Sequence, residues 1–84
     1  MSQSLYKDHR DLDATELNGI IFSALKKEYP KRVRRIVRYV IKRSNELKIL
    51  VDEPQSLSGM ITRRLRVLEE EKKVEWTPSG WKIR

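Results

Sequence analysis

The sequence predicts a mainly α-helical fold of three helices that ends in a C-terminal β-hairpin, an α+β class. Apolar residues recur at helical spacing in three segments, and the apolar period shortens to two residues after Lys72. A chain of 84 residues also has room for only one hydrophobic core. Residues 13–84 are therefore predicted to form one domain. Residues 1–12 show no clear period and are predicted to form a flexible arm.

The first helix is predicted to begin after Asp13, because Asp13 and Glu16 have the spacing of a capping box. Its apolar stripe comprises Leu17, Ile20, Ile21, Ala24 and Leu25. Pro30 disfavours a helical conformation at Tyr29, so this helix is expected to end near Glu28.

The segment 31–43 has the most regular helical period in the chain. Its apolar stripe comprises Val33, Ile36, Val37, Val40 and Ile41. The opposite side carries a basic stripe of Lys31, Arg34, Arg35, Arg38 and Lys42. Almost no acidic residue lies near this stripe, which predicts contact with the phosphates of a polyanion. The alternative is a solvated face that keeps the protein soluble.

The segment 44–55 is predicted to be a loop with a short extended stretch, and a third helix is expected to follow over 56–72. Ser56 or Ser58 can cap this helix at its N-terminus. Its apolar stripe comprises Leu57, Ile61, Leu65 and Leu68.

The C-terminal residues alternate between apolar and polar side chains, as in a β-hairpin. Pro78 and Gly80 suit its turn. Trp76 and Trp81 fall on the same side as the other apolar residues, so both are expected in the core. The alternative is that they stack on single-stranded bases.

The stretch from Ser56 to Trp76 combines a small polar start, basic residues, spaced leucines, an acidic patch and a hydrophobic strand, in that order. In this it resembles the third helix and first wing strand of winged-helix DNA-binding domains, which implies a winged-helix domain that reads double-stranded DNA. The chain departs from the family at Glu71-Lys72-Lys73, where a Gly is usual, so the helix exit is expected to differ. The turn Thr77 to Trp81 also resembles the wing of Z-form nucleic-acid-binding domains. However, Thr62 and Arg66 stand where that family has an Asn and a Tyr.

The resemblance and the helical wheel together predict the contact residues. Helix 56–72 is expected to enter the major groove with Ser56, Ser58, Gly59, Thr62, Arg63 and Arg66. Arg offers a bidentate fork to guanine or phosphate, Ser and Thr contact phosphates or base edges, and Gly permits close approach. The basic helix 31–43 is expected to contact phosphates, and the wing to touch the DNA backbone through Lys73, Lys82 or Arg84. Alternatively, Arg63 and Arg66 pair with Glu69 and Glu70 on a solvated face.

The composition favours a binding protein over an enzyme. Lys and Arg number 19 against 12 Asp and Glu, and the net charge of +7 favours anionic partners. The chain has no cysteine, no glycine-rich phosphate loop and no nucleophile–base pair, so neither catalytic residues nor cofactors are predicted. His9 lies between Asp8 and Asp11 in the predicted arm and is expected to be solvated rather than bound to a metal. No apolar run suits a membrane span or a signal segment, so a cytoplasmic protein is expected.

These patterns favour double-stranded DNA as the partner and a small transcriptional regulator as the function. Two alternatives stay open. One is a winged helix that binds RNA or a ribonucleoprotein, because small-subunit ribosomal proteins carry a similar third helix. The other is a protein-interaction module such as a viral inhibitor. A homodimer is compatible with each of these interpretations.

Overall fold

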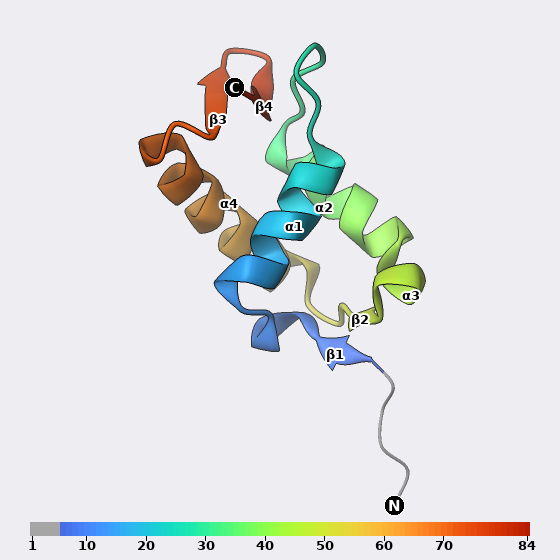
Figure 1. Cartoon of the computed structure of the whole chain (residues 1–84). Helices are drawn as coiled ribbons and strands as arrows, with labels where there is room; N and C mark the ends of the chain where they lie inside the picture. Colours follow the sequence, from blue (N-terminus) through green and yellow to red (C-terminus); the bar gives the residue numbers. More distant parts are fainter. Residues whose placement is uncertain (1–5) are drawn as a thin grey trace, which may run out of the picture.

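The computed structural model describes residues 6–84, so the first five residues of the predicted arm lie outside the described residues. Within this range, helices and short strands form an α+β fold (Figure 1). In chain order the elements are β1 (Lys7–Asp8), the 3-10 helix η1 (His9–Asp11), α1 (Ala14–Ala24), α2 (Val33–Lys42), α3 (Ser44–Leu47), β2 (Ile49–Leu50), α4 (Pro54–Glu70), β3 (Val74–Thr77) and β4 (Gly80–Ile83). The predicted class, mainly α-helical with a C-terminal hairpin, is confirmed.

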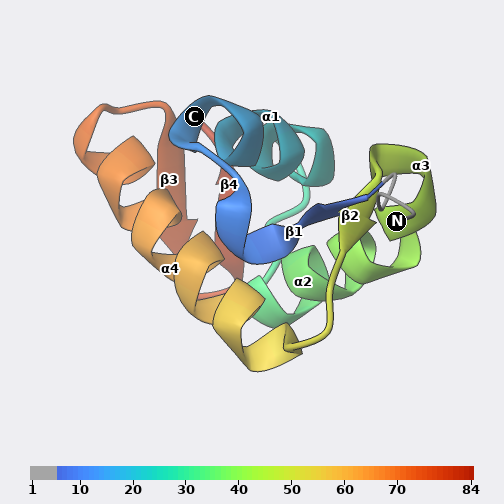
Figure 2. The same ribbon diagram turned by 90° about the horizontal axis from the view of Figure 1, so that it is seen from below.

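Helices α1, α2 and α4 pack around one apolar core, which the predicted stripes supply. Its fully buried members include Ile21 from α1, Ile36 and Val40 from α2, and Leu57, Ile61, Leu65 and Leu68 from α4. The hairpin of β3 and β4 covers one end of these helices, and β1, η1 and β2 lie at the other end (Figure 1 and Figure 2). The face of α4 opposite its apolar stripe is left exposed.

Helix α1 begins as predicted and ends about one turn earlier than predicted. The Asp13 carboxylate accepts a hydrogen bond from the Glu16 amide at 2.7 Å, and the Glu16 side chain completes the capping box. The helix ends at Ala24. The chain leaves the helix there because the Lys26 carbonyl accepts a hydrogen bond from the amide of Ile83 in the hairpin, at 3.2 Å.

Helix α2 begins at Val33, so the prediction that Lys31 belongs to it is wrong. The Lys31 amide donates to the Trp81 carbonyl, and the Trp81 amide donates to the Lys31 carbonyl, each at 2.8 Å. Lys31 therefore lies beside β4 like a residue of a third strand. Non-local pairing with the hairpin takes precedence here over helix formation.

Residues 7–12 pack onto the helices, and the prediction of a flexible arm is wrong for them. Strand β1 pairs in parallel with β2, more than forty positions further along the chain, with Lys7 opposite Ile49. The next residue, His9, is fully buried, and η1 contacts α4. The segment 44–55 contains the expected extended stretch as β2, but it also forms the short helix α3.

Helix α4 begins at Pro54, two residues before Ser56, which is the first of the two predicted capping residues. Pro54 occupies its first position, where a missing amide costs nothing, and Glu53 precedes it without a side-chain cap. Ser56 and Ser58 therefore lie inside the helix and do not cap it. At the other end Lys72 takes a positive φ of 62°. The exit therefore has the left-handed residue that usually favours Gly, with Lys in its place.

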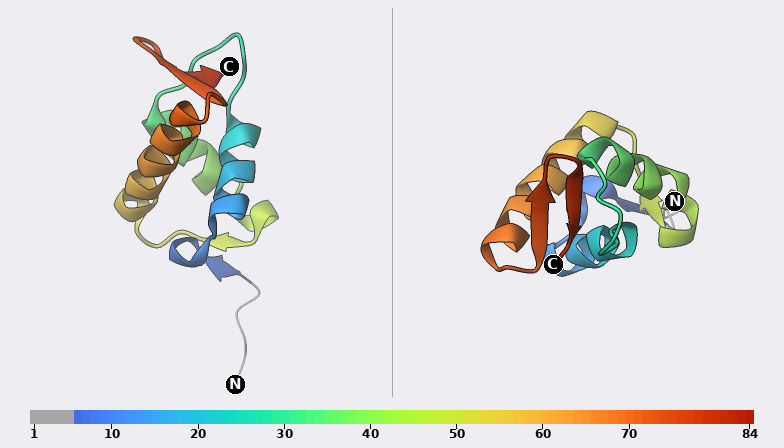
Figure 3. Two further views of the ribbon diagram at one scale, coloured as in Figure 1. Left: turned by 60° about the vertical axis from the view of Figure 1, so that its left-hand side comes forward. Right: turned by 90° about the horizontal axis from the view of Figure 1, so that it is seen from above.

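The C-terminal hairpin has the predicted strands, with Trp76 directly opposite Trp81. Trp81 is 7% exposed and belongs to the core, as predicted. The prediction is wrong for Trp76, which is 56% exposed. Strand β4 has Lys31 on one side and β3 on the other, whereas β3 is an edge strand (Figure 3). Trp76 therefore has a neighbouring strand on one side only.

Candidate nucleic-acid interface

The exposed face of α4 brings together most of the contact residues predicted on that helix. Five of them line a shallow hollow of about 440 Å³ together with Gln55: Ser56, Gly59, Thr62, Arg63 and Arg66. They share this face because the buried residues of α4 recur every three or four positions and occupy the other side. Gln55 was not predicted, because the helix was expected to begin after it.

A groove of about 730 Å³ between α4 and α2 extends this surface. Ser58 and Thr62 lie on its α4 side, and Arg34 and Arg38 on its α2 side. The Thr62 hydroxyl donates to the Ser58 carbonyl at 2.9 Å, so it is already engaged within the helix. The apolar lining consists of Val33, Val37, Ile41 and Pro54.

The predicted basic stripe is divided between two sides of α2. Arg34 and Arg38 line the groove, while Arg35 and Lys42 are exposed and do not. Lys31 lies outside the helix, with its ammonium group 5.6 Å from the centre of the Tyr39 ring. Only two of the five residues of the stripe therefore adjoin α4 at the groove.

The arginines of this surface form no ion pair with a carboxylate. Within residues 6–84, neither Arg34 nor Arg38 has a carboxylate within 4.0 Å, and the same holds for Arg63 and Arg66. The alternative that Arg63 and Arg66 pair with the acidic run of α4 is therefore not observed. Two of these arginines, Arg34 and Arg38, line the groove, and the other two line the adjoining α4 hollow. Together they favour an anionic ligand.

The basic residues predicted on the hairpin are placed differently. Lys73 lies 3.6 Å from a Glu71 carboxylate oxygen, and Lys82 lies 3.6 Å from one of Glu75. Lys82 and Glu75 are cross-strand partners on the hairpin face opposite the tryptophans. Arg84 is exposed at the C-terminus and is not a lining residue of the α4 hollow. These residues are not brought together with the exposed face of α4.

Gly59 lies in the middle of the exposed face of α4. A Cβ atom added there would meet nothing within 4 Å, and its backbone does not require glycine. A glycine in a helix costs about 1 kcal/mol of stability relative to alanine. Because nothing in the chain lies close to this position, no close contact requires the glycine and offsets that cost. The missing side chain does allow a ligand to approach the helix backbone closely.

Trp76 adjoins this surface and was assigned to the core by the sequence pattern. It lines a hollow of about 480 Å³ with Arg66, and another of about 310 Å³ with Arg34. The two-residue period places Trp76 and Trp81 on one face of the hairpin but does not show which strand lies at the edge. No signal in the sequence distinguishes the exposed ring from the buried one.

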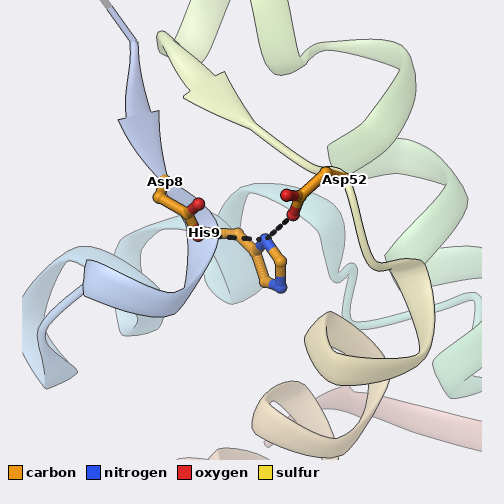
Figure 4. Close-up of side chains that lie close together, drawn as sticks. All are labelled: Asp8, His9 and Asp52. Carbon is orange, nitrogen blue, oxygen red and sulfur yellow. Dashed lines mark ion pairs between the residues drawn. The ribbon is translucent and has the colours of Figure 1, made fainter.

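A second polar cluster joins the N-terminal segment to the segment before α4 (Figure 4). The His9 Nδ1 atom lies 3.3 Å from the Leu50 carbonyl oxygen, 3.5 Å from Asp8 Oδ1 and 3.8 Å from Asp52 Oδ1. Among the described residues, Asp8, His9 and Asp52 are the group whose ligand atoms lie close enough to hold a metal ion. The expectation of a solvated His9 is wrong, because His9 is fully buried and the fold brings Asp52 from a distant segment beside it.

Arg10 already occupies the carboxylates of this cluster. Its guanidinium donates to Asp8 at 2.7 Å and to Asp52 at 3.1 Å. Hydrogen bonds from the Arg10 side chain and backbone lower the pKa of Asp8 well below its usual range, and Asp8 in turn raises the pKa of Arg10. The cluster is therefore an ion-pair network that links β1 and η1 to the start of α4.

No helix within residues 6–84 is long and apolar enough to cross a membrane. No protein-family model matches the chain, and no curated protein or solved structure is significantly similar to it.

Proposed function

We propose that this chain is a winged-helix protein that binds double-stranded DNA, with α4 in the major groove and the hairpin of β3 and β4 as its wing. One observation carries the proposal. The exposed face of α4 and the adjoining side of α2 form a continuous surface with four unpaired arginines: Arg34, Arg38, Arg63 and Arg66. A helix with an exposed polar face fits the width of the major groove.

The helix that carries each arginine suggests its role in DNA binding. Arg63 and Arg66 project from α4 and can form bidentate hydrogen bonds with the acceptor edge of guanine. Arg34 and Arg38 project from the neighbouring helix and suit the phosphates on the rim of the groove. Each phosphate that is neutralised contributes about 0.9 to the slope of log affinity against log salt. The proposed biological role is that of a small transcriptional regulator.

The proposal is tested by fluorescence anisotropy with labelled duplex DNA, single-stranded DNA and structured RNA at several salt concentrations. We expect the duplex to bind most tightly, with a steep salt dependence. The double variant Arg63→Ala/Arg66→Ala should lose at least about ten-fold in duplex affinity, because it removes two charge-assisted contacts.

The matched control is Lys26→Ala/Lys27→Ala, which removes the same net charge from exposed positions between α1 and α2. This segment lies beside β4, whose other neighbour is β3. The control should keep most of the duplex affinity. Equal losses in the two double variants would contradict the assignment to α4, and a preference for structured RNA would support the RNA-binding alternative instead.

The apolar lining of the groove between α2 and α4 favours a second candidate, a protein-interaction module. Val33, Val37 and Ile41 would contact apolar side chains of an acidic partner, and Arg34 and Arg38 would pair with its carboxylates. Tight binding to an acidic protein, together with the absence of nucleic-acid binding near physiological salt, would favour this candidate.

A further inference from the structure

The hairpin exposes one large aromatic ring, that of Trp76, on its edge strand. Trp76 is 56% exposed, although its cross-strand partner Trp81 is 7% exposed. A small domain gains stability by burying an indole, and the exposed part of Trp76 contributes nothing to that gain. Exposed aromatic rings are the platforms on which single-stranded bases stack in many nucleic-acid-binding proteins.

Two hollows meet at Trp76, and each contains an arginine of the proposed DNA surface. Arg66 lies in the hollow that also contains Glu69 and Glu70. Arg34 lies in the hollow that contains the turn residues of the hairpin. A nucleic-acid strand that leaves the exposed face of α4 past Arg66 would therefore reach the ring of Trp76 next.

The side chains of the first hollow suit a nucleobase better than a phosphate. Glu69 and Glu70 form no ion pair within residues 6–84, so both carboxylates would repel a phosphate group. Carboxylate oxygens accept hydrogen bonds from the amino groups of guanine, adenine and cytosine, whereas thymine has no amino group. The indole ring offers a face for stacking, which every base can use.

We propose that Trp76 stacks on an unpaired base next to the duplex that α4 binds, so that the preferred DNA is a duplex with a single-stranded extension. The base is unpaired because pairing and stacking inside a duplex occupy both its faces and its hydrogen-bonding edge. Guanine fits best, because two adjacent donors on its pairing edge match the two oxygens of one carboxylate. This inference rests on the proposed binding of duplex DNA.

The test compares one duplex in two forms, blunt and with a short single-stranded extension of guanines, by fluorescence anisotropy. The intact protein should bind the extended form about ten-fold more tightly, which is within the range for stacking of one base. Trp76→Ala should abolish this difference between the two forms. Trp76→Phe keeps an aromatic face and should retain most of the difference.

Tyr29→Ala is the matched control, because Tyr29 is also exposed and lies in the connection before α2, away from both hollows. It should keep the full preference for the extended duplex. Circular dichroism of each variant verifies that it is folded. Equal binding of both forms by the intact protein, or an unchanged preference in Trp76→Ala, would overturn the stacking proposal alone. If the intact protein does not bind the blunt duplex, the proposed function also fails.

Discussion

Gly80→Ala is expected to destabilise the protein by about 2–4 kcal/mol, a large part of the roughly 5–15 kcal/mol that stabilises a small domain. Gly80 has a φ of +131°, which L side chains rarely adopt. An added Cβ would lie 2.5 Å from the Lys31 carbonyl carbon and 2.8 Å from the Arg32 nitrogen. These are backbone atoms, so relief requires the hairpin to separate from the segment before α2.

The change in the free energy of unfolding is measured by urea unfolding, with circular dichroism and tryptophan fluorescence as the two signals. Separation would break both hydrogen bonds between Lys31 and Trp81 and expose the ring of Trp81. Gly19→Ala is the control, because Gly19 lies in α1 with nothing within 4 Å of its added Cβ. It should raise the stability by about 0.5–1 kcal/mol. If Gly80→Ala is as stable as the unaltered protein, the hairpin does not pack against the segment before α2.

Gly59→Leu is expected to have opposite effects on stability and on DNA binding. Gly59 is exposed, and a Cβ atom added there would meet nothing within 4 Å. Leucine favours a helix more than glycine does, by roughly 0.5–1 kcal/mol. The free energy of unfolding should therefore increase. Duplex affinity should fall at least about ten-fold, because the new side chain would hold α4 away from the DNA.

Gly19→Leu makes the same chemical change on the exposed side of α1. It should raise the stability to a similar extent without affecting duplex affinity. Unfolding and anisotropy measurements on both leucine variants therefore separate a change in the helix from a change in the contact surface. Unchanged affinity in Gly59→Leu would mean that no ligand approaches this part of α4.

The core of the fold follows from local pattern, and the ends of its elements do not. The stripes of α1, α2 and α4 were predicted because each repeats over several turns, as with Leu57, Ile61 and Leu65. The early end of α1 and the late start of α2 depend on pairing between the segment 26–31 and β4. Similarly, β1 pairs with a strand more than forty residues away, and no local period indicates this.

The candidate site shows the same division between local and non-local information. The helical wheel predicts that Arg63 and Arg66 share the exposed face of α4, because both residues lie on one regular helix. It cannot predict that α4 packs beside Arg34 and Arg38 and leaves Arg35 outside the groove, because this depends on how two helices dock. The exposure of Trp76 depends in turn on which strand of the hairpin has a second neighbour.

The exposed face of α4 is proposed to contact duplex DNA, and NMR chemical-shift mapping of backbone amides tests this contact most directly. Isotope-labelled protein is titrated with a short random-sequence duplex at moderate salt. The largest shifts should fall on residues 55–66 of α4, with smaller ones around Arg34, Arg38 and the hairpin turn. Shifts confined to α1 and α3, or no shifts at all, would contradict the claim.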